Sequence, residues 1–372
     1  MKNRLLLILA ALSLIGISAC GGKKQTPAST GGGPALKIAI VTTSGVDDGS
    51  FGQDCYNGVL AYIKTNPNAK VTSIKEPDMS KSLDAAAQVV ADYDVLILPG
   101  FQFGSIGPVA MNNPETKFII IDAFPIDKDG KEVVMPNVCG MMFKQEESGF
   151  FAGVASALET RAGKVAMVNG MPFPSNIAYQ FGFVAGVNYT NKHYGTKAAV
   201  IELPSYAGTT GNSVKVGGNY IGGFADQSTG KVVGNALINA GVDVMAVAAG
   251  DSGHGVFAAA KEAKNVHVVG CDVDRYDEGA NGNTNILLTS AVFIVHSNVT
   301  RQLEAIGNGA FTGKNELLGA AAGSTGYIST PGRHQLQADT LTKMAEVEQR
   351  LVNGEIVPPG DVSGNPANFP GL

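Results

Sequence analysis

The sequence predicts an α/β protein of two doubly wound lobes that face each other across a cleft. Short apolar strands alternate with amphipathic segments, which is the pattern of parallel sheets that carry helices on both faces. The pattern occurs twice, with 28 residues from Asp94 to Asp122 and 29 from Asp243 to Asp272. About 335 residues follow residue 36, which is enough for two domains of ordinary size.

The first lobe begins with a predicted strand at Lys37-Ile-Ala-Ile-Val41, which is apolar on both faces like a buried parallel strand. The next element is a predicted helix with apolar residues at every fourth position, namely Phe51, Cys55, Val59 and Ile63. A helix at 82–91 and strands at 94–100 and 118–122 complete this unit.

The second lobe repeats the order, with strands at 164–168, 243–250 and 267–272 and helices at 230–240 and 256–263. Ligands of open α/β sheets sit outside the carboxyl ends of the strands. The loops that leave strands at this end follow Val41, Gly100, Asp122, Val168, Gly250 and Asp272. All of them line one cleft if the two lobes oppose these edges.

The N-terminus predicts export and a lipid anchor. Positive charge at residues 1–4 precedes an apolar run, Leu5 to Ile17, that is too short to span a bilayer, so residues 1–19 are interpreted as a signal peptide. Ile17-Ser-Ala-Cys20 resembles a bacterial lipobox, which makes Cys20 the lipidated first residue, although an ordinary cleavage site before a cysteine is the alternative. Residues 20–36 hold little apolar bulk and form a flexible tether on the extracytoplasmic face of the cell membrane.

The charge balance argues against nucleic acid as a partner. The chain has 27 basic and 32 acidic residues, and removal of Lys2 and Arg4 with the signal peptide leaves 25 and 32. A mature protein about seven charges negative lacks the clustered cations that bind phosphates or an anionic membrane surface.

No metal site and no cofactor are expected. The five histidines are scattered, and Cys55, Cys139 and Cys271 have no metal-type spacing. These three cysteines are interpreted as small buried hydrophobes, with a bridge between Cys55 and Cys139 as the alternative.

The loop Val46-Asp-Asp-Gly-Ser-Phe-Gly-Gln53 follows the first strand. Its two carboxylates would repel an anion, so a phosphate cradle is excluded. Asp48 and Ser50 are of the residue types that cap helices, and Asp48 is also a candidate ligand contact. The two interpretations stay open.

Several stretches together resemble a known family. They are Asp48-Gly-Ser-Phe51, Gly100-Phe-Gln-Phe-Gly104, Phe118-Ile-Ile-Ile-Asp122, Glu147-Ser-Gly-Phe-Phe-Ala-Gly153, Tyr220-Ile-Gly-Gly-Phe-Ala-Asp226, Ala248-Ala-Gly-Asp-Ser-Gly-His-Gly255 and Gly270-Cys-Asp-Val-Asp274. In this order, over most of residues 37–330, they are similar to the basic membrane protein family. Its members are lipoprotein substrate-binding components of ABC transporters, and several bind purine nucleosides.

The resemblance implies a type I periplasmic-binding-protein fold, in which two lobes close on a small molecule about a hinge. One lobe would take residues 37–143 and about 290–312, and the other residues 144–289 and about 317–330. Residues 331–372 would form a C-terminal helix and tail. Within them, 354–360 resembles the family's closing strand, and the last dozen residues resemble an unstructured tail.

The resemblance also assigns roles in the cleft. Phe51 and Phe224 would stack on a planar base, with plain core packing as the alternative. Asp272 would accept from sugar hydroxyls and Asp122 from base nitrogens, although either acid could instead cap a turn or helix. Gly250 would bring backbone NH groups near a neutral ligand, or simply form a turn.

Three positions depart from the family pattern. Gly52 stands where an Asn is usual, Thr43 where an Asp is common, and Phe293 where a lysine contacts ribose. Without the polar contacts that the family has at these three positions, the cleft is expected to be more aromatic and less suited to a standard nucleoside.

A lipid-anchored, monomeric transport receptor that works with an ABC permease and its ATPase accounts for the anchor, the tether and the cleft acids together. The expected ligand is a purine nucleoside or a related planar compound, with a sugar, a nucleobase or a flavin-like ligand as alternatives. A signalling receptor would use the same closure. A nucleoside hydrolase with Asp122 and Asp272 as an acid/base pair is a further alternative, but no nucleophile motif supports an enzyme.

Overall fold

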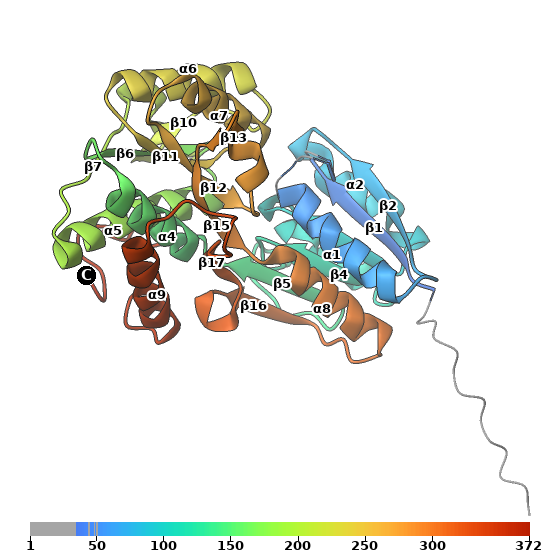
Figure 1. Cartoon of the computed structure of the whole chain (residues 1–372). Helices are drawn as coiled ribbons and strands as arrows, with labels where there is room; N and C mark the ends of the chain where they lie inside the picture. The colour runs from blue at the N-terminus through green and yellow to red at the C-terminus, as the bar shows by residue number, and fades with distance from the viewer. Residues whose placement is uncertain (1–34, 44, 48, 50) are drawn as a thin grey trace, which may run out of the picture.

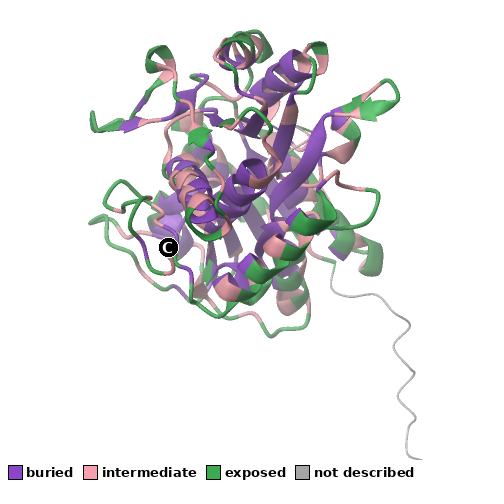
Figure 2. Ribbon diagram, turned by 60° about the vertical axis from the view of Figure 1, so that its left-hand side comes forward, coloured by how far each residue is buried: buried purple, intermediate pink, exposed green. Residues whose placement is uncertain are grey.

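The computed structural model describes residues 35–43, 45–47, 49 and 51–372. These residues form two lobes, each built on a largely parallel sheet with helices on both faces (Figure 1). The strand order is β16-β5-β4-β3-β1-β2 in the first sheet and β10-β6-β11-β12-β15-β17 in the second, where β7 also pairs with β6. The inner strands of both sheets are almost entirely buried, whereas the edge strand β2 has no buried residue and β16 has only one; the outer faces of the helices are exposed (Figure 2).

The strands of the first sheet are β1 (Lys37–Thr42), β2 (Lys70–Lys75), β3 (Val95–Pro99), β4 (Lys117–Ile121), β5 (Val138–Phe143) and β16 (Lys314–Leu318). Its helices are α1 (Phe51–Thr65), α2 (Ser82–Val89), α3 (Gly107–Asn112) and α8 (Val295–Gly307). In this lobe α8 lies beside α1 although more than two hundred residues separate them (Figure 1).

The strands of the second sheet are β6 (Lys164–Asn169), β7 (Ala199–Val200), β10 (Asn219–Tyr220), β11 (Val244–Ala248), β12 (His267–Asp272), β15 (Leu287–Phe293) and β17 (Thr325–Tyr327). Its helices are α4 (Gln145–Glu159), α5 (Pro174–Tyr194), α6 (Gln227–Asn239), α7 (Gly253–Glu262) and α9 (Ala338–Val352). Two short hairpins are β8 (Gly208–Thr209) with β9 (Lys215–Gly217), and β13 (Ala280–Asn281) with β14 (Thr284–Asn285).

The duplicated unit is visible in the sheet order. The run β1-β3-β4-β5 of the first sheet corresponds to β6-β11-β12-β15 of the second. Asp122 directly follows β4, and Asp272 is the last residue of β12. The two acids therefore occupy equivalent places in the two lobes, as the equal spacing in the sequence predicts.

Close packing of α4 on α5 forms the rigid base of the second lobe. A methyl group on Gly149 would lie 2.0 Å from the carbonyl oxygen of Tyr179, and one on Gly182 would lie 2.0 Å from that of Glu146. Because larger residues would collide with backbone, these glycines let the two helices approach each other.

The chain passes between the lobes at three places: after β5, after β15 and after β16. Backbone hydrogen bonds tie these passages together, from Lys144 N to Leu318 O at 2.8 Å and from Ile294 N to Ser324 O at 2.9 Å. The buried Glu147 carboxylate adds bonds from Ala320 N at 2.6 Å and Thr325 Oγ1 at 2.7 Å. Three linked passages are suited to serve as a hinge.

The sheets divide the chain differently from the expected lobe boundaries in two places. β15 lies in the second sheet up to Phe293, because it pairs with β12 on one side and β17 on the other. Leu317, expected in the second lobe, lies in β16, which pairs with β5 in the first sheet.

The C-terminal segment also differs from expectation. Residues 354–360 form no strand, since Pro358 and Pro359 have no NH to donate to a ladder. The last dozen residues contain no helix or strand, but they are packed against the second lobe. Phe369 is buried and meets the ring of Phe150 edge to face, with 5.9 Å between centroids.

Candidate functional site: a cleft between the lobes

A cavity of about 800 Å³ lies between the lobes at the carboxyl edges of both sheets. Seven of the eight residues predicted to contact a ligand line it: Thr43, Phe51, Asp122, Phe224, Gly250, Asp272 and Phe293. The eighth, Asp48, lies outside the described residues, as does Cys20. The structure thus brings together predicted residues from sequence positions 43 to 293.

Asp122 and Asp272 enter the cleft from opposite lobes. Both have left-handed backbone conformations, with φ of 66° and 70°. This conformation is unusual for residues other than glycine, and it persists where the surrounding structure holds it. Gln145 Nε2 donates to Asp122 Oδ1 at 2.8 Å, and the Cys271 thiol donates to Asp272 Oδ1 at 3.1 Å.

The electrostatics of this pair favour a proton on Asp122. Burial and, to a lesser extent, the charge of Asp272 raise the pKa of Asp122 to about 7, against the lowering effect of the hydrogen bond from Gln145. Near neutral pH the cleft therefore offers a carboxyl group that is protonated in part of the molecules, and it can donate as well as accept hydrogen bonds.

One wall of the cleft is aromatic. Phe173, which directly precedes α5, has its ring centroid 6.0 Å from that of Phe224 in the same lobe. It also lies 4.9 Å from the ring of Phe101, which follows β3 in the first lobe. The three rings form a continuous apolar surface that crosses from one lobe to the other.

The position of the Phe224 ring depends on two glycines. A methyl group on Gly170 would lie 2.2 Å from Phe224 Cε1, and one on Gly250 would lie 3.4 Å from Phe224 Cβ. Gly250 also has a positive φ of 53°. Gly250 thus leaves room for Phe224 in the cleft. The sequence had predicted a different role, in which its backbone NH group lies near the ligand.

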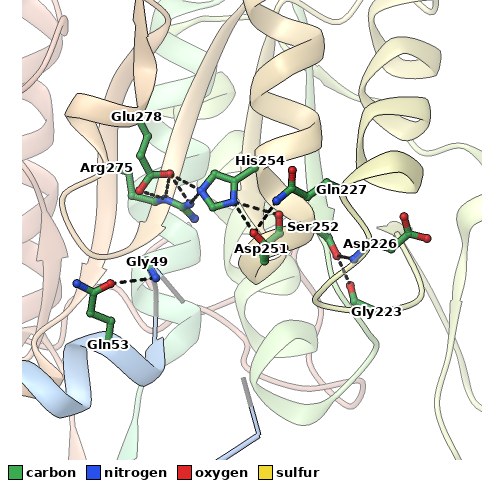
Figure 3. A network of polar contacts seen from close by, with 10 residues as sticks. All are labelled: Gly49, Gln53, Gly223, Asp226, Gln227, Asp251, Ser252, His254, Arg275 and Glu278. Carbon is green, nitrogen blue, oxygen red and sulfur yellow. Dashed lines mark hydrogen bonds and ion pairs between the residues drawn. The ribbon is translucent and has the colours of Figure 1, made fainter. Parts of the chain in front are cut away.

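Ser252 fixes the turn that carries Phe224, as Figure 3 shows for its side-chain contacts. Its Oγ accepts from Asp226 N at 2.7 Å and donates to Gly223 O at 3.1 Å, and its backbone NH donates to Phe224 O at 3.1 Å. Asp226 in turn caps α6 by accepting from Thr229 N at 2.9 Å. The ring is thereby held on the wall from both sides of its turn.

A charged network supports the edge of the cleft at the start of α7 (Figure 3). His254 Nδ1 lies 2.9 Å from Asp251 Oδ1, and Nε2 lies 3.0 Å from Glu278 Oε2. The fully buried Arg275 bonds Glu278 through Nε and lies over the ring of Phe257. The hydrogen bond to Glu278 raises the pKa of His254, although burial opposes it. When it is protonated, His254 can donate to both acids.

The remaining predicted residues differ in exposure. Phe51 begins α1 and Thr43 follows β1, and both are half-buried. Phe293 is 8% exposed and packs between Phe143 and Tyr179, at centroid distances of 6.4 and 6.1 Å. Phe293 thus closes the floor of the cleft as part of the core.

Sequence reasoning missed Phe101, Phe173, Gln145 and Tyr179, all of which line the cavity. Phe101 lies in the quoted stretch Gly100–Gly104, and Phe173 follows the strand 164–168, so strand-end position was a usable signal for both. Gln145 is the first residue of α4, two residues after the end of β5. Tyr179 lies inside α5, which has buried residues on several sides, so no pattern marks it as the residue that faces the cleft.

Other features bear on the class of the protein. Cys55, Cys139 and Cys271 are buried, and no disulfide joins Cys55 to Cys139. Among the described residues, no group of three or more His, Cys, Asp or Glu is arranged to hold a metal ion. In the same part of the chain, no helix has both the length and the apolar character needed to cross a bilayer.

Two lobes that the chain connects at three places, with a cleft lined by residues of both lobes, are typical of a solute-binding protein. The chain belongs to the family of PnrA-like substrate-binding proteins of ABC transporters, whose model matches residues 35–203 and 207–361. It is therefore a substrate-binding component and not an enzyme, and it functions outside the cytoplasm with a permease and an ATPase. The predicted fold class and family resemblance are confirmed.

Relatives match over nearly the whole chain. The CD4+ T-cell-stimulating antigen of Listeria innocua is 30% identical, over 96% of this chain and 99% of that protein. The ABC transporter nucleoside-binding protein BmpA of Lactococcus lactis is 30% identical over the same shares. Basic membrane protein A of Borreliella burgdorferi is 25% identical, over 96% of each chain.

Solved structures show the same fold. A solute-binding protein of an ABC transporter system from Aeropyrum pernix has a TM-score of 0.72 at 22% identity, over 88% of this chain and 95% of that one. Another from Conexibacter woesei has a TM-score of 0.64 at 20% identity, over 87% and 99%.

Proposed function

We propose that this protein captures a purine nucleoside, or a closely related planar compound with hydroxyl groups, and delivers it to its ABC permease. The observation that carries the proposal is the pairing of two surfaces in one cleft. The rings of Phe101, Phe173 and Phe224 offer an apolar aromatic wall, and Asp122 and Asp272 offer hydrogen-bond acceptors. A planar base suits the wall, and sugar hydroxyls suit the acids.

The relative from Lactococcus lactis, described as nucleoside-binding, supports the same ligand class. Thr43, Gly52 and Phe293 stand where the family carries polar contacts, so we expect this protein to discriminate among bases less than is usual for the family. Phe51, at the start of α1, and Asp48 would complete the face contributed by the first lobe.

Capture works by closure of the cleft. The three linked passages let the lobes rotate, and a ligand that contacts both lobes stabilises the closed form. Because the ligand binds the folded protein only, it raises the free energy of unfolding by about 2.7 kcal/mol at a hundredfold excess over Kd.

Retention at the membrane through a lipid on Cys20 completes the proposal, with the protein acting as a monomer. The sequence Ile17-Ser-Ala-Cys20 supports this step. In a bacterial host, Cys20→Ala should move the protein from the membrane fraction to the soluble fraction, and equal membrane retention of both forms would contradict the anchor.

The test of the ligand is a thermal-shift panel of purine and pyrimidine nucleosides, nucleobases, flavins and simple sugars, followed by calorimetric titration of each ligand that raises Tm. Purine nucleosides should give the largest shifts, and Phe224→Ala should weaken their binding by about 1 to 3 kcal/mol. A response to sugars alone, unchanged in Phe224→Ala, would reject the nucleoside. Chromatography of the incubated ligand should show no hydrolysis product.

A further inference from the structure

Tyr179 places a hydroxyl group at the floor of the cleft. Only 2% of the residue is exposed, and it lines the cavity from α5. Its ring meets the ring of Phe293 edge to face, with 6.1 Å between centroids and an angle of 86°. The aromatic part of Tyr179 therefore belongs to the core, and its buried hydroxyl lies near Cys271 and Asp272, which also line the cavity.

No nitrogen or oxygen atom of the described residues is placed to form a hydrogen bond with the hydroxyl, and its nearest polar neighbour is the thiol of Cys271. Six buried side-chain polar atoms share this property there, and Tyr179 Oη is the one whose residue lines the cleft. An unsatisfied hydroxyl in the interior has a free-energy cost, which a bound ligand can remove.

The groups near this hydroxyl define what it can do. Burial, with the Cys271 thiol and the Asp272 carboxylate nearby, raises the pKa of Tyr179 well above its usual value. The group is therefore a neutral hydroxyl with a proton to donate. The thiol is a weak partner, and it donates its own hydrogen to Asp272 Oδ1.

Other donors around the cleft already bond to protein acceptors. Gln145 Nε2 donates to Asp122 Oδ1 at 2.8 Å, Asn176 Nδ2 to Ala248 O at 3.0 Å, and Gln102 Nε2 to Pro99 O at 3.2 Å. These bonds hold the side chains of the cleft in place. Tyr179 Oη differs from them because its proton is not used by a strong acceptor of the described protein.

The backbone fixes the location of Tyr179. Its carbonyl oxygen lies against Gly149, where a methyl group would approach to 2.0 Å. Since α4 and α5 are packed this closely, Tyr179 cannot withdraw along the helix interface, and its hydroxyl stays beside Asp272.

We propose that Tyr179 Oη donates a hydrogen bond to the oxygen of a ligand hydroxyl that itself donates to Asp272. The inference rests on the proposed function. It means that Tyr179 and Asp272, at the floor of the cleft, select ligands that carry hydroxyl groups next to a planar ring. A donor and an acceptor at one place match a hydroxyl, which uses both, and reject an analogue in which that hydroxyl is missing.

The test compares Tyr179→Phe with the wild type by titration of adenosine and guanosine and of their dideoxy analogues, which lack both hydroxyls on the ribose ring. Tyr179→Phe should weaken binding of the ribonucleosides about 3- to 10-fold and leave binding of the dideoxy compounds unchanged. The Tm of the unliganded variant should equal or exceed that of the wild type, because the hydroxyl removed is unsatisfied.

Tyr62→Phe is the matched control. Tyr62 is equally buried and also has an unpartnered hydroxyl among the described residues, but it lies in α1 and does not line the cavity. This variant should bind every ligand like the wild type.

Equal affinity of Tyr179→Phe and wild type for the ribonucleosides would overturn the inference alone. So would an equal loss for ribonucleosides and dideoxy analogues, which would indicate altered packing. Failure of the wild type to bind any nucleoside would overturn the proposed function and this inference with it.

Discussion

Asp122 and Asp272 end equivalent strands of the two lobes, and both have left-handed backbone conformations that bring their carboxylates into one cleft. The charge of Asp272 is one cause of the raised pKa of Asp122, after burial. A duplicated unit has thus placed two acids where the ionisation of one affects the other.

Asp122 should make stability depend on pH. Its pKa of about 7 in the folded protein exceeds the ordinary value of 3.8, so the folded state binds more protons than the unfolded state between these values. The stability from this group is present below pH 4 and is lost as pH rises towards 7. Asp122→Asn should match the wild type at pH 4 and have a higher Tm at pH 8, by about 1 to 2 °C for each kcal/mol in a chain of this length. Parallel Tm profiles of the two proteins would contradict this.

Gly170→Ala should weaken ligand binding by displacing the ring of Phe224. The added methyl group would lie 2.2 Å from Phe224 Cε1, and the ring must move because it can turn more easily than the backbone. We expect a loss of about 1 to 2 kcal/mol in binding, measured by titration.

Gly223→Ala is the matched control for this change. Gly223 is next to Phe224 in the chain, but nothing lies within 4 Å of a methyl group built on it, and its φ is not positive. This variant should bind ligand as the wild type does. Equal affinity of Gly170→Ala and Gly223→Ala would show that the ring contributes little to binding.

His254 should contribute stability that decreases at alkaline pH. Its pKa is raised, first by the hydrogen bond to Glu278, and Asp251 also favours its charged form while burial and Arg275 oppose it. The contribution is present below pH 6.5 and lost as pH rises through the raised pKa. His254→Gln should therefore reduce the fall in Tm between pH 6 and 8.

His193→Gln provides a comparison of opposite sign. The pKa of His193 is lowered by burial and then by Arg350. Its removal should not reduce the fall in Tm over that range. A His254→Gln profile identical to the wild type would mean that the network does not bind a proton more tightly in the folded state.

Glu147→Gln should destabilise the hinge. The carboxylate accepts hydrogen bonds from Ala320 N and Thr325 Oγ1 and pairs with Lys144 Nζ at 3.2 Å, with its side chain 6% exposed. Ala320 N and Thr325 Oγ1 bond to one carboxylate oxygen and Lys144 Nζ pairs with the other, so the NH2 group of an amide would face a donor in either orientation. Urea unfolding should show a loss of about 1 to 3 kcal/mol.

Glu159→Gln, at the other end of α4, is the control. Glu159 accepts from Gln337 N at 2.8 Å in an exposed setting, and its change should cost less than about 0.5 kcal/mol. A similar loss of unfolding free energy in both variants would show that Glu147 has no special role in stabilising the hinge.

The sequence predicted those parts of the site that depend on strand ends. Asp122 and Asp272 follow or end strands, and parallel strands end at a common edge. Phe224 was predicted from the family resemblance. Helical positions were not predictable in this way. α5 is buried on several sides, so the pattern of apolar residues does not show that Tyr179 faces the cleft.

The lobe boundaries depended on pairing between distant segments. β15 continues to Phe293 because β12 and β17 both pair with it, and β17 comes more than thirty residues later. Local sequence does not contain this information. The positive φ of Asp122 and Asp272 was unpredictable for a similar reason, since tertiary contacts hold a conformation that the residue type disfavours.

The three passages between the lobes also set the order in which the protein can be completed during synthesis. The first sheet starts at Lys37 but gains its edge strand only at Lys314–Leu318, and the second sheet starts at Lys164 but gains β17 only at Thr325–Tyr327. Neither half is whole when three hundred residues have left the ribosome. For a chain that is exported, as proposed here, this late completion of both sheets favours passage through the membrane before a stable fold can form.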